Sequence, residues 1–85
     1  MITGLQIRSG RAALRLSAED LAALSGVSAR TIIRMEAEDG PPVSTRANLQ
    51  AVRSALESAG IEFIGTPDDR PGIRISAPAK EPGRS

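Results

Sequence analysis

The stretch LAALSGVSARTIIRME, residues 21–36, interrupts a helical pattern at a single glycine and then resumes it. Ser25-Gly26 ends the first segment, because glycine readily adopts the left-handed conformation that closes a helix. Ser28 then provides an N-cap for a second helix. Two short helices joined so closely are held at a fixed angle. The stretch therefore predicts a helix-turn-helix whose second helix is presented to a partner.

Four small or apolar residues of this stretch are expected on the inner side of the two helices. Ala22 is small where the second helix must cross closely, Val27 and Ile32 fill the angle between the helices, and Met35 closes the inner face. An unrelated helical hairpin is the alternative for the same pattern.

Two further helices are expected, one on each side of this unit. The first covers residues 3–15, with Thr3 as its cap, and Gly10 either weakens it or permits a close approach by another helix. Ser17 caps the helix before the turn, with Asp20 completing a capping box. The last helix begins near Ser44 or Thr45 and ends at Gly60.

The periodicity changes after this last helix. Residues 61–64 and 72–76 alternate as two short strands, joined by a turn over residues 65–71. We therefore divide the chain into a helical domain at 1–60, a β-hairpin at 61–76 and a disordered tail at 77–85, which is rich in proline, glycine and charge. The expected fold class is mainly α.

The composition excludes several classes of function. The 85-residue chain has no cysteine and no histidine, so neither disulfides nor the usual zinc ligands are available, and we expect no metal and no cofactor. No apolar run reaches the roughly 20 residues that span a bilayer, and the N-terminus lacks a signal peptide, which predicts a cytoplasmic location. The carboxylates and hydroxyls are scattered, so we do not expect an enzyme.

The charges are unevenly distributed despite a net charge of +1. Residues 1–34 contain five arginines but only two carboxylates, and ten of the eleven basic residues are arginine. Arginine binds phosphates and guanine edges in a bidentate manner, although a genome rich in G and C would favour arginine equally.

Residues 17–42, SAEDLAALSGVSARTIIRMEAEDGPP, resemble the lambda-repressor-like (Xre) helix-turn-helix regulators, whose pattern is S-Q-E-x-L-A-x-x-A-G-V-S-x-x-T-I-x-x-x-E-x-G. The flanking segments IRSGRAALRLS and LQAVRSALESAGIEFI…GIRI resemble a small bacterial branch of that family. The resemblance covers about residues 2–76. It implies a four- to five-helix DNA-binding domain with a terminal strand or hairpin, acting in transcription regulation.

The resemblance implies that helix 29–37 docks in the major groove of double-stranded DNA. Ala29, Arg30, Ile33 and Arg34 fall on the exposed face of that helix and are the base-contacting candidates. Arg30 and Arg34 are four residues apart, so both can point the same way and hold a guanine. The alternative is a pair of solvated arginines.

Other residues are candidates for phosphate contacts or for a structural role. Ser28, Thr31, Ser17 and Arg46 are the phosphate candidates, although capping alone can explain the serines and simple exposure can explain Arg46.

In the resembling family, an arginine of the first helix pairs with a glutamate at the end of the third, and Arg11 and Glu36 match these positions. Arg11 contacting DNA is the alternative. Ala18 departs from the family, which usually places glutamine there, so base readout is expected to be sparse.

The predicted hairpin needs a cover, because an isolated two-stranded hairpin is marginal in water. The cover is either the last helix of the same chain or the hairpin of a second chain. The second option makes Ile61, Phe63, Ile73 and Ile75 dimerisation residues, and a homodimer suits paired DNA half-sites about 34 Å apart.

The sequence thus predicts a DNA-binding transcriptional regulator, associated with the nucleoid when bound. The alternative is an interaction module that holds a protein partner, such as a toxin or the transcription machinery.

Overall fold

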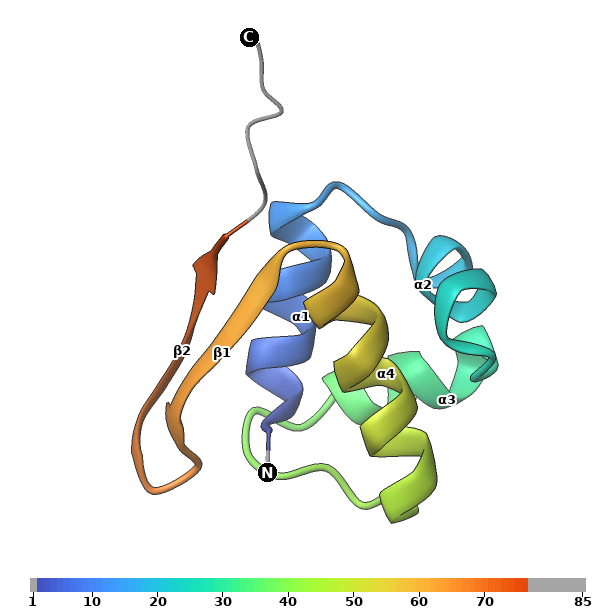
Figure 1. Ribbon diagram of the computed structural model, residues 1–85. Helices are drawn as coiled ribbons and strands as arrows, with labels where there is room; N and C mark the ends of the chain where they lie inside the picture. The colour runs from blue at the N-terminus through green and yellow to red at the C-terminus, as the bar shows by residue number, and fades with distance from the viewer. Residues whose placement is uncertain (1, 77–85) are drawn as a thin grey trace, which may run out of the picture.

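The computed structural model describes residues 2–76 as four helices followed by an antiparallel β-hairpin (Figure 1). The elements are α1 Gly4–Ala13, α2 Ala18–Ser25, α3 Ala29–Glu36, α4 Arg46–Ser58, β1 Ile61–Thr66 and β2 Asp69–Ile75. Helices α1 and α4 lie between the hairpin and the α2–α3 pair, so these two features occupy opposite sides of the molecule (Figure 1). The tail predicted at 77–85 lies outside the described residues.

Each helix begins at a hydroxyl residue that caps it. The side chains of Thr3, Ser17, Ser28 and Thr45 each accept a hydrogen bond from the backbone N–H three residues further on. The fourth helix is thus capped by Thr45 rather than Ser44. The capping box predicted between Ser17 and Asp20 is present, and Gly26 closes α2 with a φ of 77°.

The core consists of aliphatic side chains contributed by every helix and by β1. The fully buried members include Ile7, Leu21, Ile32, Met35, Val52, Leu56 and Ile61. Val27 lies in the turn and is also buried, so the four inner residues predicted for the helix-turn-helix all pack inward, with Ala22 half-buried against the core. Leu24 of α2 points away from this core and is 59% exposed.

The strands are longer than the sequence predicts, and the turn is shorter. Only residues 67–68 lie between the strands, instead of the seven residues expected. Gly65 and Arg70 have φ values of 75° and 50°, and a register shift lies between Ile64 and Thr66. The chain therefore bends within the ladder at a bulge and continues to pair beyond it.

The hairpin is covered by helices of its own chain. Ile61 pairs with Ile75 and Phe63 pairs with Ile73, so these four side chains lie on one face. Ile61 is 1% exposed within the core, and Phe63 and Ile73 pack against that core on α1 and α4. The hairpin was expected to be covered either by the last helix of its own chain or by a second chain, and in the structure helices of its own chain cover it. Ile61 has no surface left for a second chain.

A buried glutamine fastens the hairpin to α1. Gln6 is 3% exposed, and its Oε1 accepts the Thr3 N–H at 2.8 Å. Its Nε2 donates to the carbonyl oxygens of Ile64, at 3.1 Å, and Gly72, at 2.8 Å, one on each strand. One amide thus completes the cap of α1 and holds both strands, and all its polar atoms have partners, as burial requires.

The glycine that allows a close approach is Gly4, not Gly10. A Cβ at Gly4 would overlap the carbonyl oxygens of Met35 and Glu38, and the Gly4 N–H donates to Gly40 O at 2.9 Å. A Cβ at Gly10 would lie 3.4 Å from the nearest atom of Ile61, which is an ordinary contact. The first turn of α1 therefore rests directly on the backbone that follows α3.

The two glycines should respond to alanine in opposite directions. Gly4→Ala forces the backbones of α1 and the segment after α3 apart, and we expect a loss of more than about 2 kcal/mol in the free energy of unfolding. Gly10→Ala removes the helix penalty of glycine and should gain about 0.5–1 kcal/mol. Urea denaturation followed by circular dichroism measures both, and an equal loss in the two variants would contradict this packing.

Gln6→Glu tests the hairpin clamp separately from the cap. The carboxylate keeps an acceptor for the Thr3 N–H but faces two carbonyl oxygens with no proton to donate, so we expect a loss of at least about 2 kcal/mol at neutral pH. Burial raises the pKa of such a carboxyl, so part of the loss should be recovered as the pH falls. Gln50→Glu, on the exposed side of α4, is the control and should change stability little. An equal effect at both positions would rule out the clamp.

Candidate nucleic-acid interface

Helix α3 has one buried face and one exposed face. Ile32, Met35 and Glu36 are buried, whereas Arg30, Ile33 and Arg34 are exposed. Arg30, Ile33 and Arg34 therefore form the outer face of α3, and Ile33 is 56% exposed although it is apolar. Ala29 was predicted to lie on the exposed face, but it is half-buried and packs against the core. The helix ends at Glu36, with Ala37 as its C-cap.

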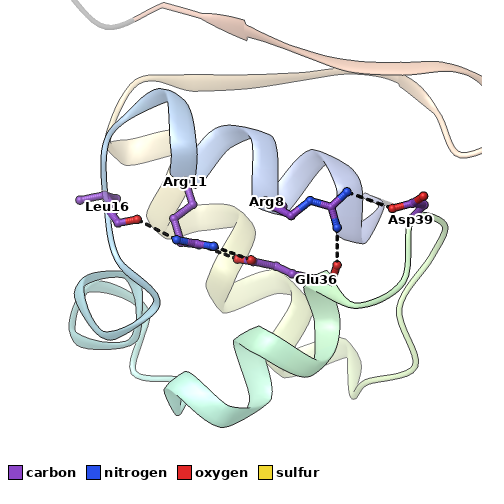
Figure 2. Close-up of polar contacts among 5 residues, drawn as sticks. All are labelled: Arg8, Arg11, Leu16, Glu36 and Asp39. Atoms are coloured by element: carbon purple, nitrogen blue, oxygen red, sulfur yellow. Dashed lines mark hydrogen bonds and ion pairs between the residues drawn. The ribbon is translucent and has the colours of Figure 1, made fainter.

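The predicted ion pair between Arg11 and Glu36 is present and is bidentate (Figure 2). Arg11 Nε donates to Glu36 Oε2 at 2.8 Å, and its NH2 group donates to Oε1 at 2.7 Å. Its third nitrogen donates to the carbonyl of Leu16 at 3.0 Å, just before α2. The hydrogen bond to Glu36 raises the pKa of Arg11 above its ordinary value, against the opposing effect of burial. One guanidinium thus joins α1, the end of α3 and the approach to α2.

A second arginine of α1 holds the same end of α3, and the sequence reasoning did not identify it. Arg8 donates to the backbone carbonyl of Glu36 at 2.7 Å and to the carboxylate of Asp39 at 3.0 Å (Figure 2). Arg8 and Arg11 are three residues apart and so share a side of the helix. That spacing, together with the acidic residues Glu36, Glu38 and Asp39, is the signal in the sequence that could have revealed the role of Arg8.

The hydroxyl groups at the start of α3 are engaged with each other. Ser28 Oγ accepts the Thr31 N–H at 3.2 Å and shares a hydrogen bond of 2.9 Å with Thr31 Oγ1. Each hydroxyl carries one proton, and this contact uses one of the two. At this end of α3, the Ser28–Thr31 pair can therefore donate one hydroxyl hydrogen bond to an external anion.

The start of α2 is already occupied by a carboxylate of the protein. Asp20 Oδ2 accepts the Ser17 N–H at 2.9 Å, and Ser17 Oγ accepts the Asp20 N–H at 3.0 Å. Hydrogen bonds to the carboxylate from the backbone N–H of Ser17 and from its hydroxyl lower the pKa of Asp20 below its ordinary value. An ionised carboxylate at a helix N-terminus repels a second anion, so Ser17 is poorly placed to bind a phosphate.

The arginines divide into two groups. Nine lie within residues 2–76, and five of these form ion pairs: Arg8, Arg11, Arg53, Arg70 and Arg74. The other four have no ion-pair partner in the described part of the chain: Arg15, Arg30, Arg34 and Arg46. Two of the four are on α3, one begins α4 and one precedes α2. The unpaired positive charge therefore belongs to the helical part of the molecule, and the hairpin has none.

Arg15 is a further residue that the sequence did not point to. It is exposed and adopts a left-handed φ of 57°, donating its backbone N–H to Ala12 O at the end of α1. This conformation is unfavourable for an L-residue with a side chain, and glycine is the usual choice at such a position. The backbone angle cannot be seen in the sequence, because nothing about an arginine signals a left-handed turn.

Neither a metal site nor a membrane-spanning segment is found in residues 2–76. No three histidine, cysteine or acidic side chains of these residues are grouped to hold a metal ion. None of their helices is long and apolar enough to cross a membrane.

Comparison of the chain with protein-family models and with curated proteins gave no match in either case.

Proposed function

We propose that this protein is a DNA-binding transcriptional regulator of the lambda-repressor-like helix-turn-helix type, which docks α3 in the major groove. The observation that carries the proposal is the pair of exposed arginines on the outer face of α3, Arg30 and Arg34, which have no ion-pair partner among residues 2–76. A helix that buries Ile32 and Met35 and turns arginines outward has the form required to enter a groove.

Few residues of α3 are available to contact DNA bases. Arg30 and Arg34 can each donate two hydrogen bonds to O6 and N7 of a guanine, and Ile33 between them can contact a thymine methyl group. Ala29 contributes less than predicted, because it is partly covered by the core. Base recognition therefore rests on three neighbouring side chains.

Phosphate contacts are assigned to residues around α3 and to the start of α4. The hydroxyl pair of Ser28 and Thr31 retains one free proton, and Arg46 and Arg15 are exposed without ion-pair partners in residues 2–76. Ser28 acts as the cap of α3, and Ser17 is not part of this set because Asp20 occupies the start of α2. Such contacts fix the position of the domain on the duplex and carry no sequence information.

The proposed active form is a two-fold dimer. Because the inner face of the hairpin is filled by α1 and α4, the dimer would use the outer side and the end of the hairpin. Ile64 is exposed on the outer side, at 37%, and Ile75 is exposed at the open end of the hairpin, at 59%. Ile75 is then the only one of the four predicted dimerisation residues with most of its surface available.

A protein-interaction module remains the second candidate, favoured by two exposed apolar side chains. Ile33 lies on α3 and Leu24 on α2, away from the core. A partner such as a toxin or a subunit of the transcription machinery could use both. A regulator of this kind can also bind DNA, so the two proposals are compatible.

The arginines of α3 are tested on DNA enriched from a random pool by the wild-type protein. Arg30→Ala and Arg34→Ala should each lower affinity by roughly 5- to 150-fold, which corresponds to the 1–3 kcal/mol of a bidentate base contact. Fluorescence anisotropy at fixed salt measures the affinity, and the melting temperature should stay nearly constant because both side chains are exposed.

Arg74→Ala is the matched control, since it removes an exposed arginine from the hairpin and should leave affinity nearly unchanged. The enriched DNA should contain a palindrome with half-sites about one helical turn apart. Enrichment of no motif, or full binding by both α3 variants, would contradict the proposal.

Arg15→Gly separates stability from DNA binding. Glycine relieves the left-handed backbone, so the free energy of unfolding should rise by about 0.5–1 kcal/mol. The loss of one phosphate contact should reduce the slope of log affinity against log salt by about one. Arg70→Gly, also left-handed but in the hairpin, should stabilise the protein equally without changing that slope. A slope that is the same in both variants would remove Arg15 from the interface.

A further inference from the structure

An open groove of about 460 Å³ lies beside the N-terminal half of α4 and is separate from the outer face of α3. Its apolar residues are Ile2 and Leu49, and its polar residues are Ser44, Arg46, Gln50 and Arg53. The volume falls within the range of small-molecule sites, which combine an apolar surface with a few polar groups.

The charge of the groove is positive and close to one unit. No carboxylate is among its lining residues. Arg53 is balanced by Glu57, with Nε 3.0 Å from Oε2, and its guanidinium lies 5.8 Å from the centre of the Phe63 ring. Arg46 has no ion-pair partner within residues 2–76. The groove therefore holds one uncompensated guanidinium beside an apolar floor.

We propose that this groove binds a small organic monocarboxylate with an apolar body. Arg46 holds the carboxylate, Gln50 and Ser44 offer further polar atoms nearby, and the apolar body lies over Leu49 and the 3% of Ile2 that stays exposed. A guanidinium binds a carboxylate through two parallel hydrogen bonds, and a single negative charge matches the single charge that the groove leaves unpaired.

The site is also a means of regulation, an inference that rests on the proposed DNA-binding function. Arg46 is the first residue of α4 and is assigned there to a DNA phosphate. A guanidinium engaged by a carboxylate in the groove is lost to the phosphate. The ligand and DNA therefore compete for Arg46, and the ligand releases the protein from its DNA.

Binding is tested first without DNA, with hexanoate as the probe. Titration of the ¹⁵N-labelled protein should shift the amide signals of Ser44, Leu49 and Gln50 in a saturable manner, with a Kd of roughly 1 mM for so small a ligand. Acetate lacks the apolar body and hexanol lacks the charge, so each should bind at least tenfold more weakly. Equal binding of hexanoate and either analogue would overturn the proposed site, as would the absence of saturable shifts.

Arg46→Gln should weaken hexanoate binding at least tenfold, whereas Arg34→Gln, which removes an equally exposed arginine from α3, should not. Equal weakening by both variants would show a general attraction to positive charge and would overturn the site.

The competition is tested on the enriched DNA by fluorescence anisotropy. Hexanoate should lower the affinity of the wild-type protein by severalfold relative to the same concentration of acetate. It should have no such effect on Arg46→Gln. Hexanoate that fills the groove and leaves DNA affinity unchanged would overturn the competition. A protein that binds hexanoate but no DNA would refute the proposed function instead, so the two failures can be distinguished.

Discussion

The arrangement of the helices depends on the guanidinium of Arg11. It holds the Glu36 carboxylate through two hydrogen bonds and the Leu16 carbonyl through a third. Because Glu36 is the last residue of α3, this contact fixes the end of α3 against α1 and so determines which side of α3 faces outward. The glutamate side chain is 7% exposed, and removal of one partner from such a pair costs about 3–5 kcal/mol because the other charge stays buried. The pair therefore acts as a constraint on geometry more than as a source of net stability.

Helix α1 is attached on two sides by different kinds of contact. Toward α3 it uses charge, through Arg8 and Arg11, and a close approach of backbones at Gly4. Toward the hairpin it uses the amide of Gln6 and aliphatic packing around Ile61. The two arginines of α1 are thus both engaged in ion pairs that hold this helix in place. The arginines without ion-pair partners in residues 2–76 all lie outside α1. This division separates a scaffold from a surface available for binding.

The sequence predicts the features whose causes are local. The caps at Thr3, Ser17 and Ser28 and the left-handed turn at Gly26 follow from single residues, and the inward residues of α3 follow from its periodicity. Contacts between residues far apart in the sequence cannot be predicted in this way. Gln6, for example, donates hydrogen bonds to carbonyl groups 58 and 66 residues further along the chain. The left-handed angles of Arg15 and Arg70 cannot be predicted either, because neither is a glycine. The predicted turn is too long because the glycine, proline and aspartate residues of 65–71, which are typical of turns, lie mostly within the two strands. In the candidate site, the outward direction of Arg30 and Arg34 could be predicted, but the structure was required to show that neither has an ion-pair partner in the described part of the chain.

The small number of proposed base-contacting residues on α3 is an argument for the proposed dimer. Two bidentate arginines discriminate between base pairs by about 2–6 kcal/mol in total if each contributes its usual 1–3. Specific binding usually exceeds non-specific binding by about 4–10 kcal/mol, so one domain reaches only the lower part of that range. Two copies on a palindrome double the discrimination and cover the whole range. If α3 reads bases as proposed, a domain with so few base-contacting residues needs a second copy to be selective. The hairpin, on which Ile64 and Ile75 are exposed, lies on the side of the molecule away from α3 (Figure 1), so a pair formed through it would leave both copies of α3 free for DNA.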